Sequence, residues 1–386
     1  MPSPFASPSA SPSASPTASP SASASPSASS STVGEDRQLI AELVAPDPSI
    51  FWADLLLSAG LGWAAVAAAV VLVPMPLRAA AVVIAVISLY RGLCLLHEIS
   101  HLRLGSLRGF ETAWNLLIGV PLLMPSFIYG ASHLDHHKSA TYGTLADPEY
   151  LPFARGRGRI VAFMVENALM PFVLPIRFLL GSVIGLAIPP VHRFLETHAS
   201  TLCFNHDYRR TVSPAERSSM KRWEAVMVVG WAATTWLLWD HGVLVQTLMV
   251  LAAAFEAIAI INALRTLAAH RYRGDGTTMN REQQLLDSVD ITRGLATTIW
   301  APIGLRYHAM HHYFPGVPYH HLRHLHTRVM AQLAEDGAYR RAICPSVSRS
   351  LLTLWSGEHR SATASGPDES APPPTAQNAP TVAGTA

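Results

Sequence analysis

Charged side chains are scarce in this chain of 386 residues, because Asp, Glu, Lys and Arg together make up only 14% whereas hydrophobic residues make up 49%. A soluble globular domain carries about 25% charged residues. The deficit, together with a mean hydropathy of +0.24, excludes an ordinary soluble protein and indicates an integral membrane protein. The formal net charge is only +2, which argues against nucleic acid as the main partner.

Cysteine is also rare, and its pattern excludes two kinds of site. The three cysteines, Cys94, Cys203 and Cys344, are odd in number and far apart, and none belongs to a C-x-x-C pair. Such a pattern predicts neither a disulfide framework nor a cysteine-ligated zinc site. The chain also lacks a haem-binding C-x-x-C-H motif and a glycine-rich dinucleotide-binding motif, so we expect no fused redox domain.

The two ends of the chain contain little that could form a core. Residues 1–36 are a Ser/Pro/Ala-rich leader without the basic and apolar regions of a signal peptide, and residues 361–386 have a similar character. Such a composition cannot bury enough apolar surface to fold. We therefore expect both ends to be disordered and place the membrane domain at about residues 50–335.

Long apolar runs are present between these ends. A membrane-spanning helix needs about 20 apolar residues, and residues 55–77 and 79–96 predict a helical hairpin whose second helix leads directly into His97. Residues 225–264 predict a second hairpin, broken near its middle by Asp240-His241-Gly242. Basic residues flank both open ends of this second hairpin, and the positive-inside rule places those ends in the cytoplasm.

Two further apolar stretches, residues 112–132 and 160–191, are interrupted by prolines, and the second also contains Glu166 and Arg177. Proline and charge disfavour clean crossings, so these stretches suit interfacial or re-entrant segments. We predict an all-α integral membrane fold with two transmembrane helical hairpins, which gives about four spans, with six as the alternative. The interrupted stretches would supply interfacial helices, and the polar segments, rich in His and Arg, predict a cytoplasmic His-rich cap.

Histidine is abundant where other polar residues are scarce, and nine histidines fall in four groups. At positions i, i+3 and i+4 of a helix, side chains project from one face. Each group can therefore aim its imidazoles, the commonest protein ligands for iron and zinc, at one point. Nine exceed the four ligands of a tetrahedral zinc, so the count indicates two metals. The groups are His97 and His101, then His133, His136 and His137, then the single His270, and finally His308, His311 and His312.

One of these groups has a competing interpretation. The segment from His97 to His101 matches the H-E-x-x-H signature of zinc metalloproteases, in which both histidines would bind zinc and Glu98 would be the general base. A protease with a single zinc has no use for the other clustered imidazoles. We keep the membrane zinc metalloprotease as an alternative from another class.

The order of the groups, H-x-x-x-H, H-x-x-H-H, a lone His after the last hairpin, and H-x-x-H-H again, resembles the membrane fatty acid desaturase/hydroxylase superfamily. The resemblance covers roughly residues 50–335. Residues around the boxes are similar to those of bacterial fatty acid desaturase-like proteins, namely Tyr142-Gly143-Thr144, Asp147-Pro148-Glu149-Tyr150, His270-Arg271-Tyr272, Tyr307 before the last box and Phe314-Pro315 after it.

This resemblance implies a non-haem site with two Fe2+ ions that activates O2 and removes hydrogen from a fatty acyl chain. The implied ligands are His97, His101, His133, His136, His137, His270, His308, His311 and His312. The leading hypothesis is a fatty acyl desaturase in the inner (plasma) membrane of a bacterial type of cell, with its metal site facing the cytoplasm. A related hydroxylase or an alkene-forming fatty acid decarboxylase is the alternative. The substrate would be a fatty acyl lipid, an acyl-CoA or an acyl carrier, and a ferredoxin, rubredoxin or cytochrome b5-like donor with its reductase would supply electrons.

Several nearby polar residues are candidates for supporting roles. We expect Glu98, Asp135 and Asp147 to orient the imidazole rings from a second layer of contacts. Some relatives place an asparagine four residues before the lone histidine, but here that position is Thr266 and the nearest asparagine is Asn262.

Two further sets of polar residues lie outside these boxes. Glu256 lies within a predicted span, where a carboxylate is expensive and suggests a function. A basic stretch after the last box predicts a surface for an acidic electron donor or for lipid headgroups; it contains His320, His321, His324 and His326.

Overall fold

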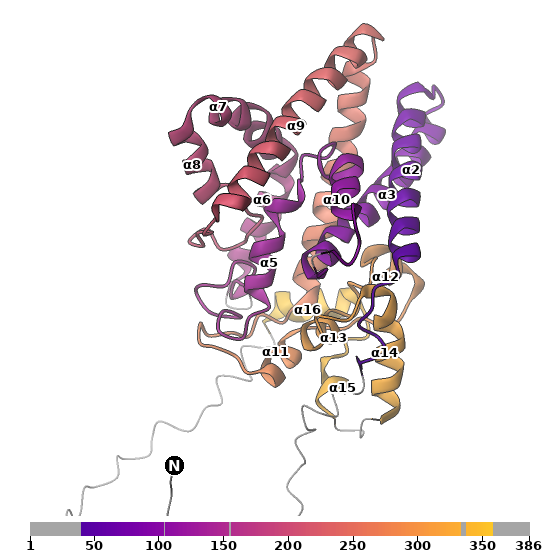
Figure 1. The fold of residues 1–386 in the computed structure, drawn as a ribbon. Coiled ribbons are helices and arrows are strands. Elements are labelled where there is room, and N and C mark those ends of the chain that lie inside the picture. The colour runs from indigo at the N-terminus through magenta and orange to yellow at the C-terminus, as the bar shows by residue number, and fades with distance from the viewer. Residues whose placement is uncertain (1–39, 104, 154–155, 333–336, 358–386) are drawn as a thin grey trace, which may run out of the picture. The chain divides into compact units, whose positions relative to one another are not determined.

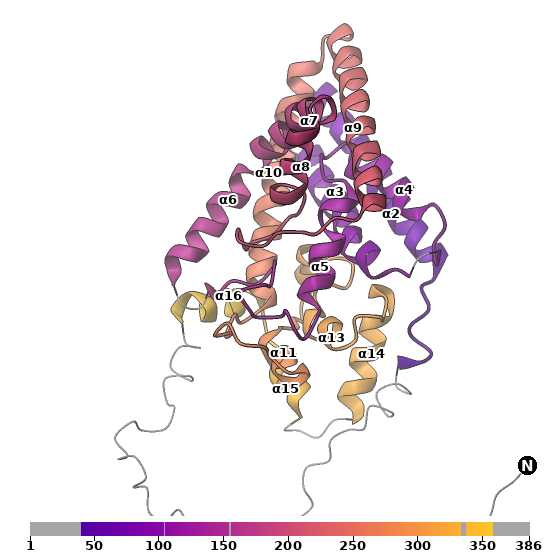
Figure 2. The same cartoon turned by 60° about the vertical axis from the view of Figure 1, so that its left-hand side comes forward.

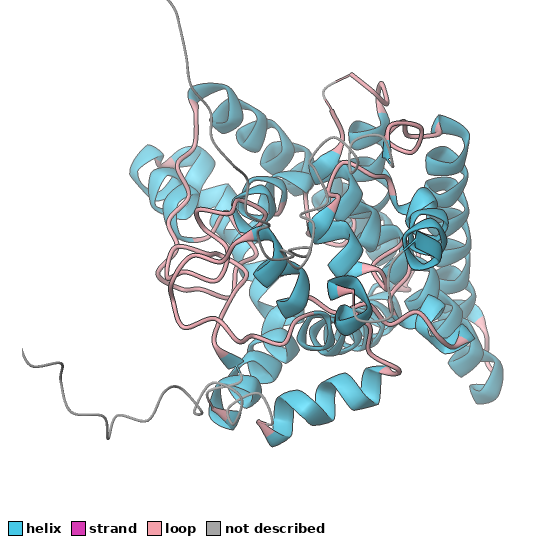
Figure 3. Cartoon of the chain, turned by 90° about the horizontal axis from the view of Figure 1, so that it is seen from below, coloured by secondary structure: helices cyan, strands magenta, loops and turns pink. Residues whose placement is uncertain are grey.

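The computed structural model describes residues 40–103, 105–153, 156–332 and 337–357. The predicted disordered leader, 1–36, and tail, 361–386, lie outside these residues. The chain divides into two compact units, Met1–Glu42 and Leu43–Ala386, and the description below concerns the second. Every regular element within the described ranges is a helix (Figure 3), apart from isolated bridges between single residues, which confirms the predicted all-α fold.

The first predicted hairpin is present as α2 (Pro48–Val71) and α3 (Met75–His101). Asp47 begins α2, because its carboxylate accepts a hydrogen bond from the backbone N–H of Ser49 at 2.8 Å. The two helices pack closely at Gly62, where an added Cβ would lie 2.5 Å from Cδ2 of Leu89. The last turn of α3 carries His97 and His101, so this rigid pair of helices delivers the first histidine box.

The stretch 112–132 does not form one long helix. It contains α4 (Phe110–Trp114), the π-helical η1 (Asn115–Gly119) and the short 3-10 helix η2 (Ser126–Ile128), before α5 (Gly130–His136) begins. The indole N–H of Trp114 donates to the carbonyl of Gly92 at 2.7 Å, which packs the segment against α3. The segment therefore folds beside the hairpin, and α5 carries the second box on a short helix, as predicted.

The stretch 160–191 is more continuous than its prolines suggest. Helix α6 (Arg157–Pro175) passes through the π-helical η4 (Ile176–Leu180) into α7 (Gly181–Ala187), and α8 (Pro189–His198) follows. Pro171 and Pro175 lie inside α6. Proline has no backbone N–H to donate, and the regular α-helical hydrogen bonding changes to a π-helical turn directly after Pro175.

The second predicted hairpin consists of α9 (Pro214–Asp240) and α10 (Leu244–Ala269). It turns at Gly242, whose φ of 69° lies in the left-handed region that glycine adopts without strain. Helix α10 packs against α6, α3 and α2, and it ends directly before His270. The long helices run side by side in Figures 1 and 2.

Four of the described helical segments are long and apolar enough to span a membrane: Pro48–Val71, Met75–His101, Arg157–Ala187 and Leu244–Ala269. The number agrees with the prediction, but the set differs. The interrupted stretch supplies one span, whereas α9 falls outside the set because charged residues fill its first half.

Shorter helices complete the unit beyond the histidine-bearing ends of α3 and α10 (Figure 1). They are α11 (Arg281–Asp287), α12 (Leu295–Trp300), α13 (His308–Tyr313), α14 (Tyr319–Gln332), α15 (Ala338–Ala342) and α16 (Val347–Ser356). Helix α13 carries the third histidine box, and all three of its histidines are buried. This part of the fold therefore positions that box against the ends of the long helices.

Candidate metal centre

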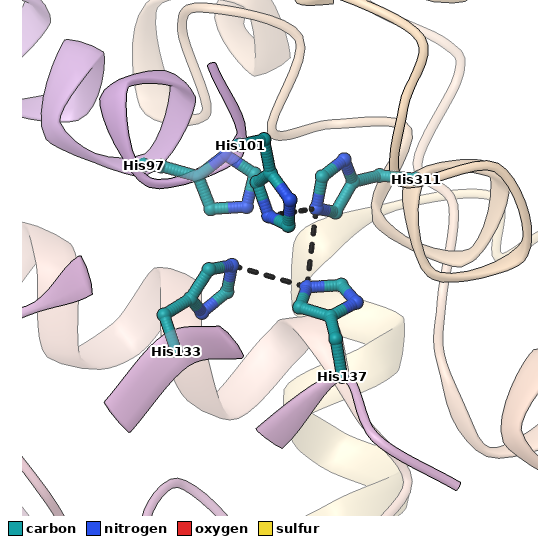
Figure 4. A group of neighbouring side chains, drawn as sticks. All are labelled: His97, His101, His133, His137 and His311. Atoms are coloured by element: carbon teal, nitrogen blue, oxygen red, sulfur yellow. Dashed lines mark hydrogen bonds between the residues drawn. The ribbon is translucent and has the colours of Figure 1, made fainter. Parts of the chain in front are cut away.

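The four histidine groups, far apart in sequence, meet in space. One cluster brings a ligand-capable nitrogen from each of five residues within 4.8 Å of one another. Figure 4 shows these rings pointing toward a common centre from α3, from α5 and the residue after it, and from α13. The five residues are His97, His101, His133, His137 and His311.

A second cluster contains His136, His270 and His312, all buried. His308 joins them, because its Nε2 lies 2.8 Å from Nε2 of His270 and 3.1 Å from Nε2 of His312. The structure therefore brings all nine predicted histidines into two adjacent clusters, including the isolated His270.

Each H-x-x-H-H box contributes to both clusters, in opposite proportions. In the box that ends α5, the outer pair, His133 in the helix and His137 directly after it, faces the first cluster, and the middle His136 faces the second. On α13 the outer pair, His308 and His312, faces the second cluster and the middle His311 faces the first. The two boxes therefore share one sequence pattern but divide their histidines between the clusters in opposite ways.

The donor set fits metal ions. When two nitrogens bind the same ion at about 2.1 Å and at right angles to each other, they lie about 3 Å apart. In the first cluster, Nε2 of His311 lies 3.1 Å from Nε2 of His101 and 3.2 Å from Nε2 of His137. Nε2 of His97 is buried among them with no hydrogen-bond partner. A polar atom in that position needs a partner, and a metal ion would be one.

Six of the seven rings outside the membrane-spanning helices are also in the protonation state that metals require, and His136 is the exception. Burial, reinforced by neighbouring imidazoles, lowers the pKa of His133, His137, His270, His308, His311 and His312 well below the ordinary value. These rings are therefore neutral near pH 7, and each offers a nitrogen lone pair.

Acidic side chains orient several rings through the nitrogen that faces away from the clusters. The Asp147 carboxylate contacts Nδ1 of His136 at 2.9 and 3.0 Å. Although burial opposes protonation of His136, this buried carboxylate outweighs it and raises the pKa of that ring. Glu98 contacts Nδ1 of His97 at 3.1 Å. Both residues lie where second-layer carboxylates were expected.

Asp135 does not have the role predicted for it. Its carboxylate contacts Nζ of Lys138 at 2.5 Å and accepts from the hydroxyl of Tyr208 at 2.7 Å, without touching an imidazole. The reason is geometric, because position 135 follows His133 by two residues and so projects from another face of α5.

Four further residues support the rings although the sequence did not predict that role for them. Glu149 and the hydroxyl of Tyr129 contact Nδ1 of His133, at 3.2 and 2.9 Å, and burial raises the pKa of Glu149 to about 7. The Tyr142 hydroxyl donates to Asp287 at 3.0 Å and lies 3.0 Å from Nδ1 of His270. Glu149 and Tyr142 stood within the motifs that carried the resemblance, whereas Asp287 lies in no recognisable pattern and is found only through the fold.

Glu98 is poorly placed for the general-base role of the protease alternative. One carboxylate oxygen contacts Nδ1 of His97, and the other accepts the backbone N–H of Tyr319 at 3.0 Å. Both oxygens of this buried group are thus used to hold the ring and the start of α14, and neither is left to activate water.

A mainly apolar cavity of about 430 Å³ lies against the clusters. His97, His270 and His308 form part of its wall, and residues of α3, α6 and α10 form most of the rest. Asn262 and Thr266 also line it, whereas Glu256 is half-buried on α10 and is not among the lining residues. The volume is typical of a site for a small-molecule ligand.

The basic stretch after the last box is only partly surface. His320 accepts the backbone N–H of Asp47 at 3.1 Å, and Nδ1 of His326 lies 2.5 Å from the Tyr339 hydroxyl. These two rings therefore hold α14 in place, while Arg323 and His324 are exposed.

Fold and site together define a membrane protein with two histidine clusters beside a mainly apolar cavity. The fatty acid desaturase family model matches residues 73–343, so the chain belongs to this family. It is 34% identical over 328 residues to a ceramide hydroxylase of Caulobacter vibrioides, an alignment that covers 82% of this chain and 91% of that protein. No solved structure matches the chain.

Proposed function

We propose that this protein is an O2-dependent membrane oxidoreductase with two non-haem irons, and that it hydroxylates a ceramide-type lipid. The observation that carries the proposal is the position of the two histidine clusters at the wall of an apolar cavity between membrane-spanning helices. An oxidant formed there would meet a lipid chain and not a water-soluble substrate. The similarity to a ceramide hydroxylase favours ceramide and hydroxylation.

In this proposal all nine histidines are metal ligands. One ion would be held by His97, His101, His133, His137 and His311, and the other by His136, His270, His308 and His312. Bound iron would supply reductive activation of O2 and oxidation of an unactivated C–H bond. In the balanced reaction one oxygen atom enters the C–H bond, and the other leaves as water after receiving two electrons and two protons.

The protein's own residues would prepare this chemistry in three ways. Asp147 and Glu149 fix the orientation of the rings on α5. The apolar wall excludes water and aligns the lipid chain. Because the chain carries no redox motif of its own, we infer a separate electron donor with its reductase, which would reach the site from the cytoplasmic side of a bacterial-type inner membrane.

Desaturation is the second candidate, and the family model favours it. Desaturases and hydroxylases share the histidine boxes, and the position of the C–H bond relative to the oxidant decides the product. The histidine geometry is the same for both outcomes, so product analysis has to separate them.

The test is lipid analysis of a ceramide-containing bacterial host that expresses the full chain under ¹⁸O2. Hydroxylation predicts a ceramide that gains one ¹⁸O atom, and desaturation predicts a lipid that loses two hydrogens without gaining oxygen. His136→Ala should abolish the product, whereas His241→Ala, in the exposed turn between α9 and α10, should leave it unchanged. One zinc and no iron in the purified protein, or a product that survives His136→Ala, would contradict the proposal.

A further inference from the structure

Arg265 places a positive charge on the wall of the lipid cavity. It lies on α10, within the segment suited to span a membrane. Its Nε–H donates to Oδ1 of Asn262 at 3.2 Å and its Nη2 to Oγ1 of Thr266 at 3.0 Å. All three residues line the cavity, so together they form a polar patch on its mainly apolar wall.

No carboxylate pairs with this guanidinium in the part of the chain that the structure describes. The ionisable side chains around it include the phenols of Tyr90 and Tyr129 and the thiol of Cys94. Glu149 also lines the cavity, but it lies beyond ion-pair distance and contacts His133. A guanidinium in an apolar cavity is costly unless an acceptor meets its N–H groups.

We propose that Arg265, supported by Asn262 and Thr266, is the subsite that binds the polar acceptor group of the lipid, which for a ceramide is the amide carbonyl. The guanidinium has five donors in a planar fork, and the contacts to Asn262 and Thr266 hold this fork in place while leaving donors for the substrate. The proposal rests on the proposed function, because it concerns how the same cavity holds its lipid.

The position of Arg265 also sets which carbon meets the metal centre. It lies five residues before His270, the residue that directly follows α10, and five residues correspond to about 7.5 Å along a helix axis. A carbonyl held at Arg265 therefore places the nearest carbons of the lipid, and not the middle of a long chain, beside His270 and His308. We expect oxidation within a few bonds of the amide.

The test compares the full-length enzyme with Arg265→Met, which keeps the hydrocarbon stem and removes the donors. Binding of a C16 ceramide and of palmitic acid is measured without O2 in lipid nanodiscs, so that turnover plays no part. We expect Arg265→Met to bind ceramide about tenfold more weakly. Its thermal stability should be unchanged or higher, because an uncompensated charge has been removed. The exposed Arg222→Met on α9 is the matched control and should bind as the wild type does.

The outcomes separate this proposal from the proposed function. If wild-type protein oxidises no lipid but Arg265→Met still loses ceramide binding, the function fails and the subsite stands. If palmitic acid binding falls and ceramide binding does not, the subsite stands and its acceptor is a carboxylate. Equal binding of both lipids by Arg265→Met and wild type would overturn the subsite. Arg265→Gln and Asn262→Leu serve the same comparison if Arg265→Met does not fold.

A second readout is the position of oxidation in the product. Wild-type enzyme should oxidise one position near the amide, whereas Arg265→Met should raise KM more than it lowers kcat and spread oxidation over several carbons. An unchanged KM and an unchanged single position in Arg265→Met would also count against the subsite.

Discussion

At the scale of single residues, carboxylates and phenols decide which imidazole nitrogen faces each cluster. The Asp147 carboxylate accepts a hydrogen bond from Nδ1 of His136, and the hydroxyl of Tyr142 bridges Nδ1 of His270 and the carboxylate of Asp287. In both cases the contact occupies Nδ1 and leaves Nε2 for the cluster. Such partners fix the tautomer and raise the basicity of a ligand.

Asp147→Asn should weaken metal retention at the second cluster and lower turnover by about 10- to 100-fold. The amide can still accept a hydrogen bond but no longer supplies the charge that favours the oriented ring. Iron per chain and product formation are the measurements. Asp135→Asn is the matched control, because Asp135 contacts Lys138 and Tyr208 and no imidazole. Equal losses in both variants would show that charge on this segment, and not contact with His136, is responsible.

The sequence indicated which histidines come together better than it indicated the residues that support their rings. The histidine boxes stand out because their imidazoles recur at helical spacing within a few residues. Supports come from anywhere in the fold, as Asp287 shows, so no local pattern marks them. Asp135 illustrates the converse, since its place between two ligands suggested a role that the helical geometry does not allow.

At the scale of elements, Asp290 anchors the short helix α13. Its Oδ1 accepts the backbone N–H groups of Ala309 and Met310 at 2.6 and 3.2 Å, and its Oδ2 accepts the Tyr339 hydroxyl at 2.6 Å. A helix of six residues has little stability of its own. This carboxylate therefore helps to hold all three histidines of the last box at the centre.

The same carboxylate should make stability depend on pH. Burial, despite these hydrogen bonds, raises the pKa of Asp290 from 3.8 to about 7. Between these values the folded state binds more protons than the unfolded state, so the contribution of Asp290 to stability falls as pH rises from about 4 to 7. Between about pH 4 and pH 7, the unfolding free energy of wild type should fall by up to about 4 kcal/mol relative to that of Asp290→Asn. Denaturant titration of both proteins in detergent is the measurement. A difference that does not change with pH would contradict the assignment.

Element boundaries were predicted unevenly. The α2–α3 hairpin follows from two clean apolar runs. Helix α6 was ambiguous because Pro171 and Pro175 normally end a helix, and the π-helical turn that absorbs them leaves no sequence signal. In α9 the helix was recognised, but its charged first half removes it from the apolar set.

At the scale of the whole molecule, the clusters join segments that are distant in sequence. His101 lies at the end of α3, and its Nε2 is 3.1 Å from that of His311 on α13. A metal bound at such a place stabilises the folded state by mass action, by about 4 kcal/mol when the free ion exceeds its dissociation constant about 1,000-fold.

Removal of the metals should therefore loosen the shorter helices more than the membrane hairpin. We expect a chelator to lower the unfolding temperature by about 10 °C. Hydrogen exchange should increase in α5 and α13, whereas α2 and α3 keep their protection because their interface is apolar and tightly packed at Gly62. Uniform loss of protection over all four helices would mean that the metals support the entire fold.

The reversed use of the two H-x-x-H-H boxes has a consequence for assembly. His136 and His137, at the end of α5, are neighbours in sequence but face different clusters, and the same holds for His311 and His312 on α13. In the proposed two-iron protein, the first ion to arrive would fix both short helices and so preorganise the ligands of the second. Filling of the two positions would then be cooperative, and a sample given too little iron would contain mostly molecules with no ion or with two ions, and few with a single ion.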